Sequence, residues 1–435
     1  MNMTTTLDRK LSIAVTVDRP DCVYRADATA SLSVSASFEG GAAPSEGLVH
    51  VRVDNYGSRI SEERDIDLSK ENPFRLAVTR ATPGFARVSI SSLSHGIQVA
   101  ENPGNPAGTY VFGIAFSPEE ILPGTPCPKD FMEFWKDAIE KLDKTVPPDP
   151  QMELVPEHST GPCDYWRVSF ATFGGRRVYG WLSEPKAAGC YPVYVNVPGA
   201  GIGACGTNED PASVTLTMNV HSYRQPEGDT PEAAAERQRL YEAQDAEYAK
   251  PNGVPRYCQA GIHKGREDYF YYASVLGINR AVDWLAARSK CNLSAFYYSG
   301  TSQGGGFGLM LTALNKHIVR SCIFVPAITD LMSSKIEDRQ SGWPQIIENQ
   351  PQENRAAAEK WAPYFCGTNF ARQIKCPIRF TVGFCDMACA PHAVYAAYNV
   401  CPSADKAIMH GVGMGHGVYG RFYTELSEWL LKAHL

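Results

Sequence analysis

The sequence predicts a protein of two parts, an all-β part over residues 1–115 and an α/β part over residues 116–435. In the first part, apolar and polar residues alternate with period two, as in strands that bury one face. From about residue 165, continuous apolar runs alternate with segments of helical spacing, which predicts a mainly parallel sheet covered by helices. Pro- and Gly-rich segments at 102–106 and 118–126 favour a boundary between the two.

Strand-like runs in the first part are short and separated by turn signals. They cover residues 11–17, 30–36, 48–53 and 85–90. Several short strands at this spacing predict a small antiparallel sandwich of immunoglobulin-like type. The residues of this part suggest no catalytic constellation.

A helix is expected over residues 130–144, directly after the boundary. Asp130 is expected to cap it while Glu133 reaches back, which is the pattern of a capping box. One face of this helix is apolar, which indicates that it packs against the core. The residues on that face are Phe131, Phe134, Trp135, Ile139 and Leu142.

The rest of the chain alternates buried strands with helices. Strands are predicted at 191–197, 294–299, 321–325 and 378–382, and helices around 275–285 and 306–315. A final helix is predicted from the apolar face formed by Tyr419, Phe422, Leu426, Trp429, Leu430 and Ala433. This order predicts a central, mainly parallel sheet.

Residues 224–264 are interpreted as an insertion, because they hold seven acidic and six basic residues and little strand character. Thr230 is suited to cap a helix that starts at Pro231. Tyr241 and Tyr248 lie about two turns apart and are expected to pack inward from one face. The segment is either a solvated surface excursion, a rim over an active site or a contact between subunits.

Composition excludes several classes of function. The net charge is −6, with 41 basic and 47 acidic residues, so no nucleic-acid partner is expected. No apolar run approaches the ~18–20 residues that span a bilayer, so no membrane partner is expected. The N-terminal residues lack the pattern of a signal peptide. A cytoplasmic location is expected for the sequence as it stands, and a periplasmic or secreted one if a signal peptide has been removed.

The 13 cysteines are scattered, odd in number and without a C-x-x-C pair. This is typical of reduced, mostly buried thiols rather than of a disulfide framework. Cys385, Cys389 and His392 come nearest to a metal cluster, but zinc prefers four ligands at recurring spacings. No metal site is therefore predicted.

The strongest chemical signal is Gly300-Thr-Ser-Gln-Gly304, which fits G-x-S-x-G between a predicted strand and a predicted helix. This context is typical of the nucleophile turn of an α/β-hydrolase fold. A nucleophile on such a sharp turn is strained, and Gly300 and Gly304 suit flanking positions that leave no room for a Cβ. Ser302 is therefore the predicted nucleophile, and the following helix directs its positive end to the same place.

A serine nucleophile needs a base, and in this fold the histidine follows the serine and the acid in the chain. The candidates after Ser302 are His317, His392, His410, His416 and His434. His416 is favoured because it lies in a glycine-rich loop between a strand and the last helix. Asp386 is the favoured acid because it directly follows a buried strand, and Asp330 is the alternative.

The oxyanion hole requires two backbone donors. The N–H of Gln303, directly after the nucleophile, is the expected first donor. The second is expected from the loop at 198–203, which follows a buried strand. That loop lacks the G-x-G-x-x-G spacing of a dinucleotide site.

These motifs resemble the acetyl xylan esterase and cephalosporin C deacetylase family, also called carbohydrate esterase family seven. Besides 300–306, the resemblance rests on segments 130–135, 173–181, 268–272, 280–285, 383–386 and 396–399, and it covers residues 115–435. By position, it implies a Ser302, Asp386 and His416 triad. It further implies an oxyanion hole formed by the backbone N–H groups of Gln303 and Ala200.

The resemblance implies a serine esterase that removes short acyl groups, chiefly acetyl, from sugars. It implies no cofactor and an acetylated oligosaccharide or a similar small ester as substrate, and since members of the family are often oligomeric, a homo-oligomer is one expectation. Two departures suggest a different substrate shape: the loop at 198–203 lacks the aromatic residue that the family commonly carries near Ala200, and residues 219–222 stand where members usually have Asp-x-Arg-Gly. The alternatives are a serine peptidase of the prolyl-oligopeptidase type and a catalytically silent carbohydrate-binding protein.

Overall fold

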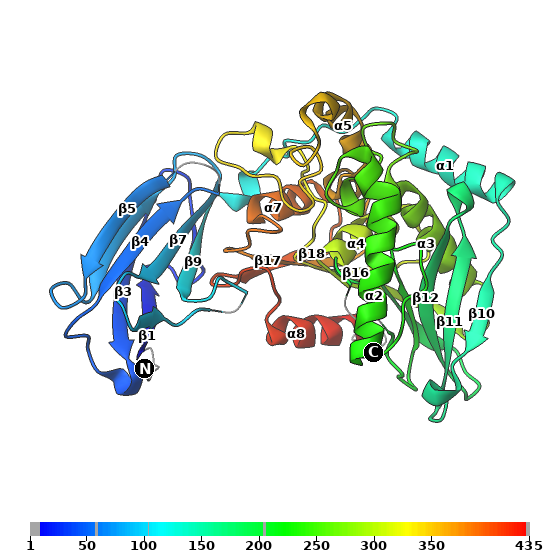
Figure 1. The fold of residues 1–435 in the computed structure, drawn as a ribbon, viewed down its shortest axis with the longest axis horizontal. Helices are drawn as coiled ribbons and strands as arrows, with labels where there is room; N and C mark the ends of the chain where they lie inside the picture. Colours follow the sequence, from blue (N-terminus) through cyan, green and yellow to red (C-terminus); the bar gives the residue numbers. More distant parts are fainter. Residues whose placement is uncertain (1–8, 57–59, 103, 203–205, 432–435) are drawn as a thin grey trace, which may run out of the picture.

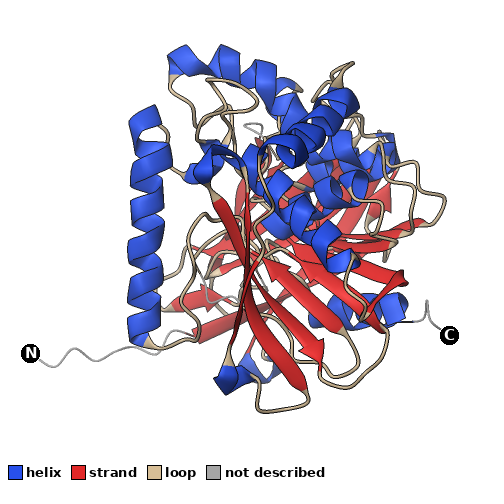
Figure 2. Ribbon diagram, turned by 90° about the vertical axis from the view of Figure 1, so that its right-hand side faces the viewer, coloured by secondary structure: helices blue, strands red, loops and turns tan. Residues whose placement is uncertain are grey.

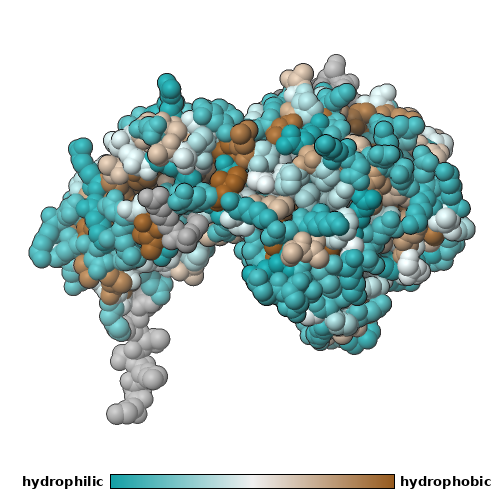
Figure 3. Space-filling model, turned by 90° about the horizontal axis from the view of Figure 1, so that it is seen from above, coloured by the Kyte–Doolittle hydropathy of each residue, from teal (hydrophilic) through white to brown (hydrophobic). Residues whose placement is uncertain are grey.

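The computed structural model describes residues 9–56, 60–102, 104–202 and 206–431. Two small sheets form the N-terminal part, and one nine-stranded sheet with its helices forms the rest (Figure 1). Seen from above, these parts are two lobes of unequal size joined by a narrower region (Figure 3). None of the helices in the described ranges is both long and apolar enough to pass through a bilayer.

The N-terminal strands form a four-stranded sheet of order β6-β3-β1-β8 and a five-stranded sheet of order β2-β9-β7-β4-β5. The alternating runs are confirmed as strands β1, β3, β4 and β7, and in β3 alternate side chains are buried as the pattern predicts. The nine strands are β1 (Arg9–Val17), β2 (Val23–Tyr24), β3 (Thr29–Phe38), β4 (Leu48–Asp54), β5 (Ile60–Asp67), β6 (Phe74–Thr79), β7 (Gly84–Ser92), β8 (Ile97–Val99) and β9 (Thr109–Phe116).

Two of the remaining strands, β5 and β9, were missed in the sequence because their residues do not alternate between apolar and polar. β5 is a charged strand at the edge of its sheet, as expected where an unpaired edge is protected from aggregation. β9 is buried on both faces over most of its length, so its residues do not alternate. It lies where the N-terminal part meets the rest of the protein.

The large sheet has the order β10-β11-β12-β14-β13-β15-β16-β17-β18. From β14 to β18 all pairings are parallel, as predicted, whereas β10, β11 and β12 add an antiparallel edge. The strands are β10 (Gln151–Leu154), β11 (Cys163–Ala171), β12 (Arg177–Pro185), β13 (Tyr191–Asn196), β14 (Val214–Met218), β15 (Cys291–Thr301), β16 (Arg320–Phe324), β17 (Ile378–Gly383) and β18 (Lys406–Gly411).

Helices cover both faces of this sheet (Figure 1). Alternate residues of the central strands point to opposite faces, so Phe296 and Tyr298 join the core under α3 and α4, while Tyr297 packs towards α8. The helices are α1 (Phe131–Thr145), α2 (Pro231–Gln244), α3 (Phe270–Ala286), α4 (Gln303–Leu314), α5 (Arg355–Trp361), α6 (Gly367–Ala371), α7 (Pro391–Val400) and α8 (Gly420–Leu431). Ala433, predicted for the last helix, lies outside the described residues.

The capping box predicted at Asp130 is wrong. Asp130 occupies the N-cap of α1, but its side chain makes no capping hydrogen bond. Its carboxylate instead accepts hydrogen bonds from the Arg266 guanidinium and the Tyr364 hydroxyl. A charged donor and a phenol from distant segments offer stronger partners than a backbone N–H.

The predicted start of the insertion helix is confirmed. Thr230 Oγ1 accepts a hydrogen bond of 3.2 Å from the Ala233 N–H at the start of α2. Tyr241 and Tyr248 are half-buried, and Tyr241 contacts the ring of Tyr257 within the insertion, while Tyr248 contacts the ring of Phe270 on α3. Figure 2 shows α2 at the margin of the molecule, apart from the helices that cover the sheet.

The cysteines of the described residues agree with the prediction of reduced, mostly buried thiols. The twelve in the described part of the chain are free, and nine of them are buried. Cys205 lies outside the described residues. The cellular compartment stays a prediction.

Candidate active site

Ser302 lies on a sharp turn between β15 and α4. Its backbone has φ 57° and ψ −119°, a conformation that side chains with a Cβ rarely adopt. The turn is held by the Ser302 N–H, which donates to the Phe324 carbonyl, and by the Ala327 N–H, which donates to the Ser302 carbonyl. The strained nucleophile turn predicted from G-x-S-x-G is therefore present.

The two glycines of the motif are required by close packing. A Cβ at position 304 would lie 1.9 Å from the Val197 carbonyl oxygen on the neighbouring strand connection. A Cβ at position 300 would lie 2.7 Å from the Gly304 carbonyl oxygen. Neither contact is tolerable between heavy atoms, so Gly300 and Gly304 allow the turn to form.

Three predicted side chains meet beside this turn. Ser302 Oγ lies 3.1 Å from His416 Nε2, and His416 Nδ1 lies 2.9 Å from Asp386 Oδ2. Asp386 follows β17, and His416 lies between β18 and α8, so three loops at one edge of the parallel sheet bring them together. This is the relay of nucleophile, imidazole and carboxylate that acyl transfer needs.

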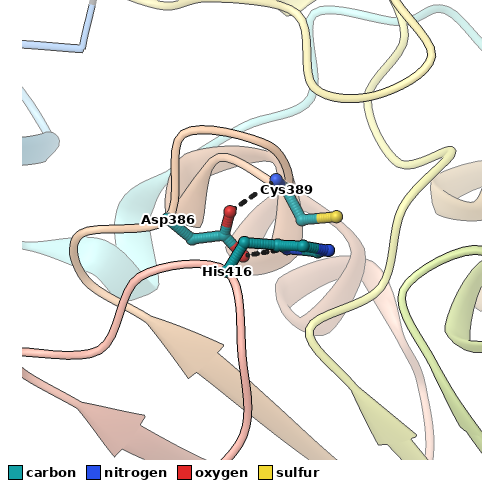
Figure 4. A group of neighbouring side chains, drawn as sticks. All are labelled: Asp386, Cys389 and His416. Atoms are coloured by element: carbon teal, nitrogen blue, oxygen red, sulfur yellow. Dashed lines mark hydrogen bonds and ion pairs between the residues drawn. The ribbon is translucent and has the colours of Figure 1, made fainter. Parts of the chain in front are cut away.

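The carboxylate of Asp386 is fully buried and fixed on both oxygens. Oδ1 accepts from the Ala388 and Cys389 N–H groups, each at 2.8 Å, and Oδ2 faces His416 (Figure 4). Burial lowers the pKa of His416, but the hydrogen bond and the charge of Asp386 outweigh it. The pKa of His416 therefore lies above its ordinary value.

The alternative acid, Asp330, has other partners. Its carboxylate accepts hydrogen bonds from the N–H groups of Gly124 and Thr125 and from the Thr125 hydroxyl. Burial raises its pKa. Asp330 therefore anchors the 124–125 segment and does not orient His416.

The other candidate histidines are also bound elsewhere. His392 is buried with Nε2 2.9 Å from the Gln340 carbonyl oxygen, and burial lowers its pKa to about 3. His410 Nε2 lies 2.6 Å from the Tyr395 hydroxyl. His317 lies 3.8 Å from Asp283. His434 lies outside the described residues.

The expected oxyanion donors lie on the two sides of Ser302. Gln303 is the first residue of α4, and N–H groups in a first helical turn have no partner within the helix. On the other side, a Cβ at Gly199 would lie 4.0 Å from Ser302 Cβ, so the loop that carries Ala200 is adjacent. Gly203, the end of the predicted loop, lies outside the described residues.

The side chain of Gln303 connects α4 with the loop that carries Ala200, a contact that the sequence did not suggest. Its Oε1 accepts hydrogen bonds from the hydroxyls of Tyr257 (2.7 Å) and Tyr271 (2.6 Å). Its Nε2 lies 3.4 Å from the carbonyl oxygens of Pro198 and Gly199. Tyr257 belongs to the 224–264 insertion, so the insertion reaches the centre of the site.

His221 is a residue that the sequence did not single out as functional. Its Nε2 lies 3.2 Å from the Gly201 carbonyl oxygen, and its Nδ1 lies 2.8 Å from Nε2 of Gln244 on α2. The Gln244 amide donates to Nδ1, so the imidazole N–H is on Nε2 and donates to Gly201. Burial lowers the pKa of His221 to about 4, which keeps the ring neutral. The only sequence signal was the departure at 219–222.

Cys389 also lies at the site. Its thiol is within interaction distance of Ser302, and burial raises its pKa well above the usual range. The atoms of Asp386, Cys389 and His416 that could bind a metal ion lie within 4.8 Å of one another, and Figure 4 shows the three side chains. In the described part of the chain, this group is found in place of the Cys385, Cys389 and His392 set considered from the sequence. Because Asp386 and His416 already bind each other, we assign the group to the relay.

Comparison with known proteins gives a consistent result. A model of the acetyl xylan esterase (AXE1) family matches residues 119–433. The acetyl esterase Axe7A of Xylanibacter ruminicola is 28% identical over 331 residues, which are 73% of this chain and 70% of that protein.

Two solved structures share the fold. One is an acetyl xylan esterase from Paenibacillus sp. R4, with a TM-score of 0.58 and 21% identity over 72% of this chain and 98% of that chain. The other is acetyl xylan esterase 1 from Thermoanaerobacterium sp. JW/SL YS485, with a TM-score of 0.59 and 20% identity over 73% and 98%. Both agree with an α/β-hydrolase fold.

Proposed function

The chain belongs to the acetyl xylan esterase family and is a carboxylic ester hydrolase, and from this premise we propose that it removes acetyl groups from carbohydrates with Ser302, His416 and Asp386 as its triad. The observation that carries the assignment of residues is the continuous relay from Ser302 Oγ through His416 to the buried Asp386 carboxylate. The name of the relative Axe7A supports an acetyl ester as substrate.

The reaction begins when Ser302 Oγ attacks the acyl carbon while His416 Nε2 takes the hydroxyl proton. The backbone N–H groups of Gln303 and Ala200 stabilise the negative charge that forms on the carbonyl oxygen. When the tetrahedral intermediate collapses, His416 returns the proton to the leaving sugar hydroxyl, and the acetyl group stays on Ser302.

A water molecule then attacks the acetyl-serine, and His416 takes a proton from it. When the second intermediate collapses, the bond to Ser302 Oγ breaks, His416 returns its proton to this oxygen, and acetate is released. Asp386 holds the imidazole in one tautomer and stabilises the imidazolium that forms in each half-reaction.

We also propose that residues 1–115 form an immunoglobulin-like sandwich and that residues 116–435 form the hydrolase domain. The two N-terminal sheets and the start of the family match at residue 119 support this division. The homo-oligomer implied by the resemblance stays a prediction. The peptidase and the silent binding protein are not favoured, since the family and the named relatives are esterases.

The experiment is fluorophosphonate labelling with peptide mass spectrometry, combined with turnover of p-nitrophenyl acetate and of acetylated xylo-oligosaccharides. We expect the label on Ser302, and we expect Ser302→Ala to lower kcat by at least about 10⁴-fold. Ser299→Ala, three residues earlier on β15, is the matched control and should keep full activity. Full activity in Ser302→Ala would overturn the assignment, and turnover of a p-nitroanilide but not of esters would favour the peptidase.

A further inference from the structure

The loop that carries His416 is bound by side chains from the N-terminal part. Asn102 Nδ2 donates to the Gly413 carbonyl at 2.7 Å, and Asn105 Nδ2 donates to the same oxygen at 2.9 Å. Gly413 lies three residues before His416. Two amide donors more than 300 residues away in sequence therefore fix the start of the catalytic histidine loop.

Backbone packing continues this contact up to His416 itself. A Cβ at Gly415 would lie 2.1 Å from the Gly104 carbonyl oxygen, and a Cβ at Gly104 would lie 3.3 Å from the backbone of Gly415 and His416. Gly104 also has φ 77°, which side chains with a Cβ rarely adopt. The two chain segments are thus in direct van der Waals contact, without room for a larger residue at either glycine.

The loop that carries Asp386 is held from the same side. The hydroxyl of Tyr56, a residue only 1% exposed, donates to the Phe384 carbonyl. A Cβ at Gly113 on β9 would lie 2.4 Å from Phe384 Cβ, and the Phe85 ring packs against the Phe384 ring with centroids 5.1 Å apart. Phe384 is two residues before Asp386.

The two loops are also hydrogen-bonded to each other and to β9. The Phe384 N–H donates to the Gly411 carbonyl, and the Cys385 N–H donates to the Met414 carbonyl. The Gly113 N–H on β9 donates to the Val412 carbonyl at 3.0 Å. Figure 1 shows β9 facing β17 and β18, the strands from which the two loops emerge. A shift of the N-terminal part would move both members of the Asp386 and His416 pair.

We propose that the N-terminal β-rich part serves as a positioning element of the catalytic site, in which Asn102, Asn105 and Tyr56 fix the loops of His416 and Asp386. This inference rests on the proposed triad. The three residues lie outside the segment matched by the family model, which begins at residue 119. Loss of one of these contacts is expected to lower the rate strongly, because a misplacement of about 1 Å in a reacting group can cost about 10²-fold in rate.

The test uses the full chain and two variants that remove one contact each. Asn105→Ala deletes a donor to Gly413, and Tyr56→Phe deletes the hydroxyl that binds Phe384 while keeping the ring. We expect each to lower kcat for p-nitrophenyl acetate by about five- to twentyfold, because the relay becomes less well aligned. KM should change less than about twofold, because neither residue is expected to touch the substrate.

The pH profile separates positioning from general destabilisation. In the described part of the chain, Asp386 and Cys389 place titratable atoms within 4.8 Å of His416, while Asn102, Gly104 and Asn105 carry no titratable side chain. The hydrogen bond to Asp386 raises the pKa of His416, so a looser loop, which weakens this bond, lowers that pKa. The acid limb of kcat/KM should therefore move to lower pH in Asn105→Ala.

Matched controls lie in the same N-terminal sheets. Asn72 binds both backbone groups of Ala36 with its amide, and the Tyr24 hydroxyl binds Asp18. Asn72→Ala and Tyr24→Phe should lower the unfolding midpoint without changing kcat or the pH profile. If Asn105→Ala and Tyr56→Phe behave like these controls, the positioning role is overturned. Ser302 labelling in the unmodified protein tests the triad separately, so failure of either idea is recognised on its own.

Discussion

His416 owes its basicity to one neighbour. Burial alone lowers the pKa of His416, and the Asp386 hydrogen bond and charge raise it to above the ordinary value of 6.5. A general base must be neutral to accept the serine proton. The kcat/KM for an acetyl ester should therefore rise with pH through a pKa above 6.5 and then reach a plateau.

Asp386→Asn tests this balance. We expect kcat to fall by about 10⁴-fold, because an amide favours the wrong imidazole tautomer. The acid limb of kcat/KM should move to lower pH, since the interactions that raise the pKa of His416 are lost while its burial remains. The measurement is a pH series of p-nitrophenyl acetate turnover.

Asp405→Asn is the control for this change. Asp405 is half-exposed, pairs with Arg379 and lies before β18, away from the relay. Its variant should keep both kcat and the position of the acid limb. An acid limb that stays in place in Asp386→Asn would show that Asp386 does not set the pKa of the base.

At the level of secondary-structure elements, the insertion is hydrogen-bonded to the loop that we propose to carry the oxyanion donor Ala200. Gln244 on α2 binds His221, and His221 binds the Gly201 carbonyl next to Ala200. Tyr257 reaches Gln303 and, through it, the carbonyls of Pro198 and Gly199. Of the interpretations open from the sequence, these contacts favour a functional segment next to the active site over a solvated excursion.

His221→Phe is the variant that tests this coupling. Phenylalanine keeps an aromatic ring between Tyr223 and Tyr257, but it leaves the Gly201 carbonyl and the Gln244 amide without their partner. We expect kcat to fall by about 10- to 100-fold, less than the cost of deleting an oxyanion donor outright. Steady-state kinetics on p-nitrophenyl acetate measure the effect.

His317→Phe provides the comparison, because His317 packs beside Phe296 and pairs with Asp283 far along the chain from the loop. It should retain the kcat of the unmodified enzyme. A normal kcat in a folded His221→Phe variant would mean that the oxyanion loop holds its place without the insertion.

Across the whole molecule, the two parts are joined by a continuous core. Leu32 and Phe85 of the N-terminal sheets belong to the same hydrophobic cluster as Phe384 and Tyr395 of the hydrolase part. All seven tryptophans lie between residues 135 and 429. Tryptophan fluorescence therefore reports on the hydrolase part alone, whereas far-UV circular dichroism reports on both.

Leu32→Ala should destabilise both parts together. Removal of this buried side chain is expected to cost about 2–5 kcal/mol. With a shared core, urea midpoints from tryptophan fluorescence and from circular dichroism should fall by the same amount. Ser35→Ala, exposed on the same strand, should leave both midpoints unchanged. An unchanged fluorescence midpoint in Leu32→Ala would show that the N-terminal part unfolds independently.

The sequence by itself determined the local features of this protein. The parallel strands around Ser302 follow from hydrophobic period, the need for Gly300 follows from sterics within the motif, and the order of Ser302, Asp386 and His416 follows from the edge at which parallel strands end. The motif also predicted a glycine at 304, but the atom for which it makes room, the Val197 carbonyl oxygen, belongs to a distant segment. The capping box at Asp130 failed for the opposite reason, because its carboxylate found partners from distant segments.

Only the tertiary structure decided which remote residues support the site. Asn105 and His416 are 311 positions apart, and nothing in the local sequence of either indicates the other. The same holds for Tyr56 at Phe384 and for Gln244 at His221. Amide and hydroxyl donors can pair with any suitable acceptor, so their partners depend on how distant segments pack, whereas hydrophobic period can be read from neighbouring residues of the chain.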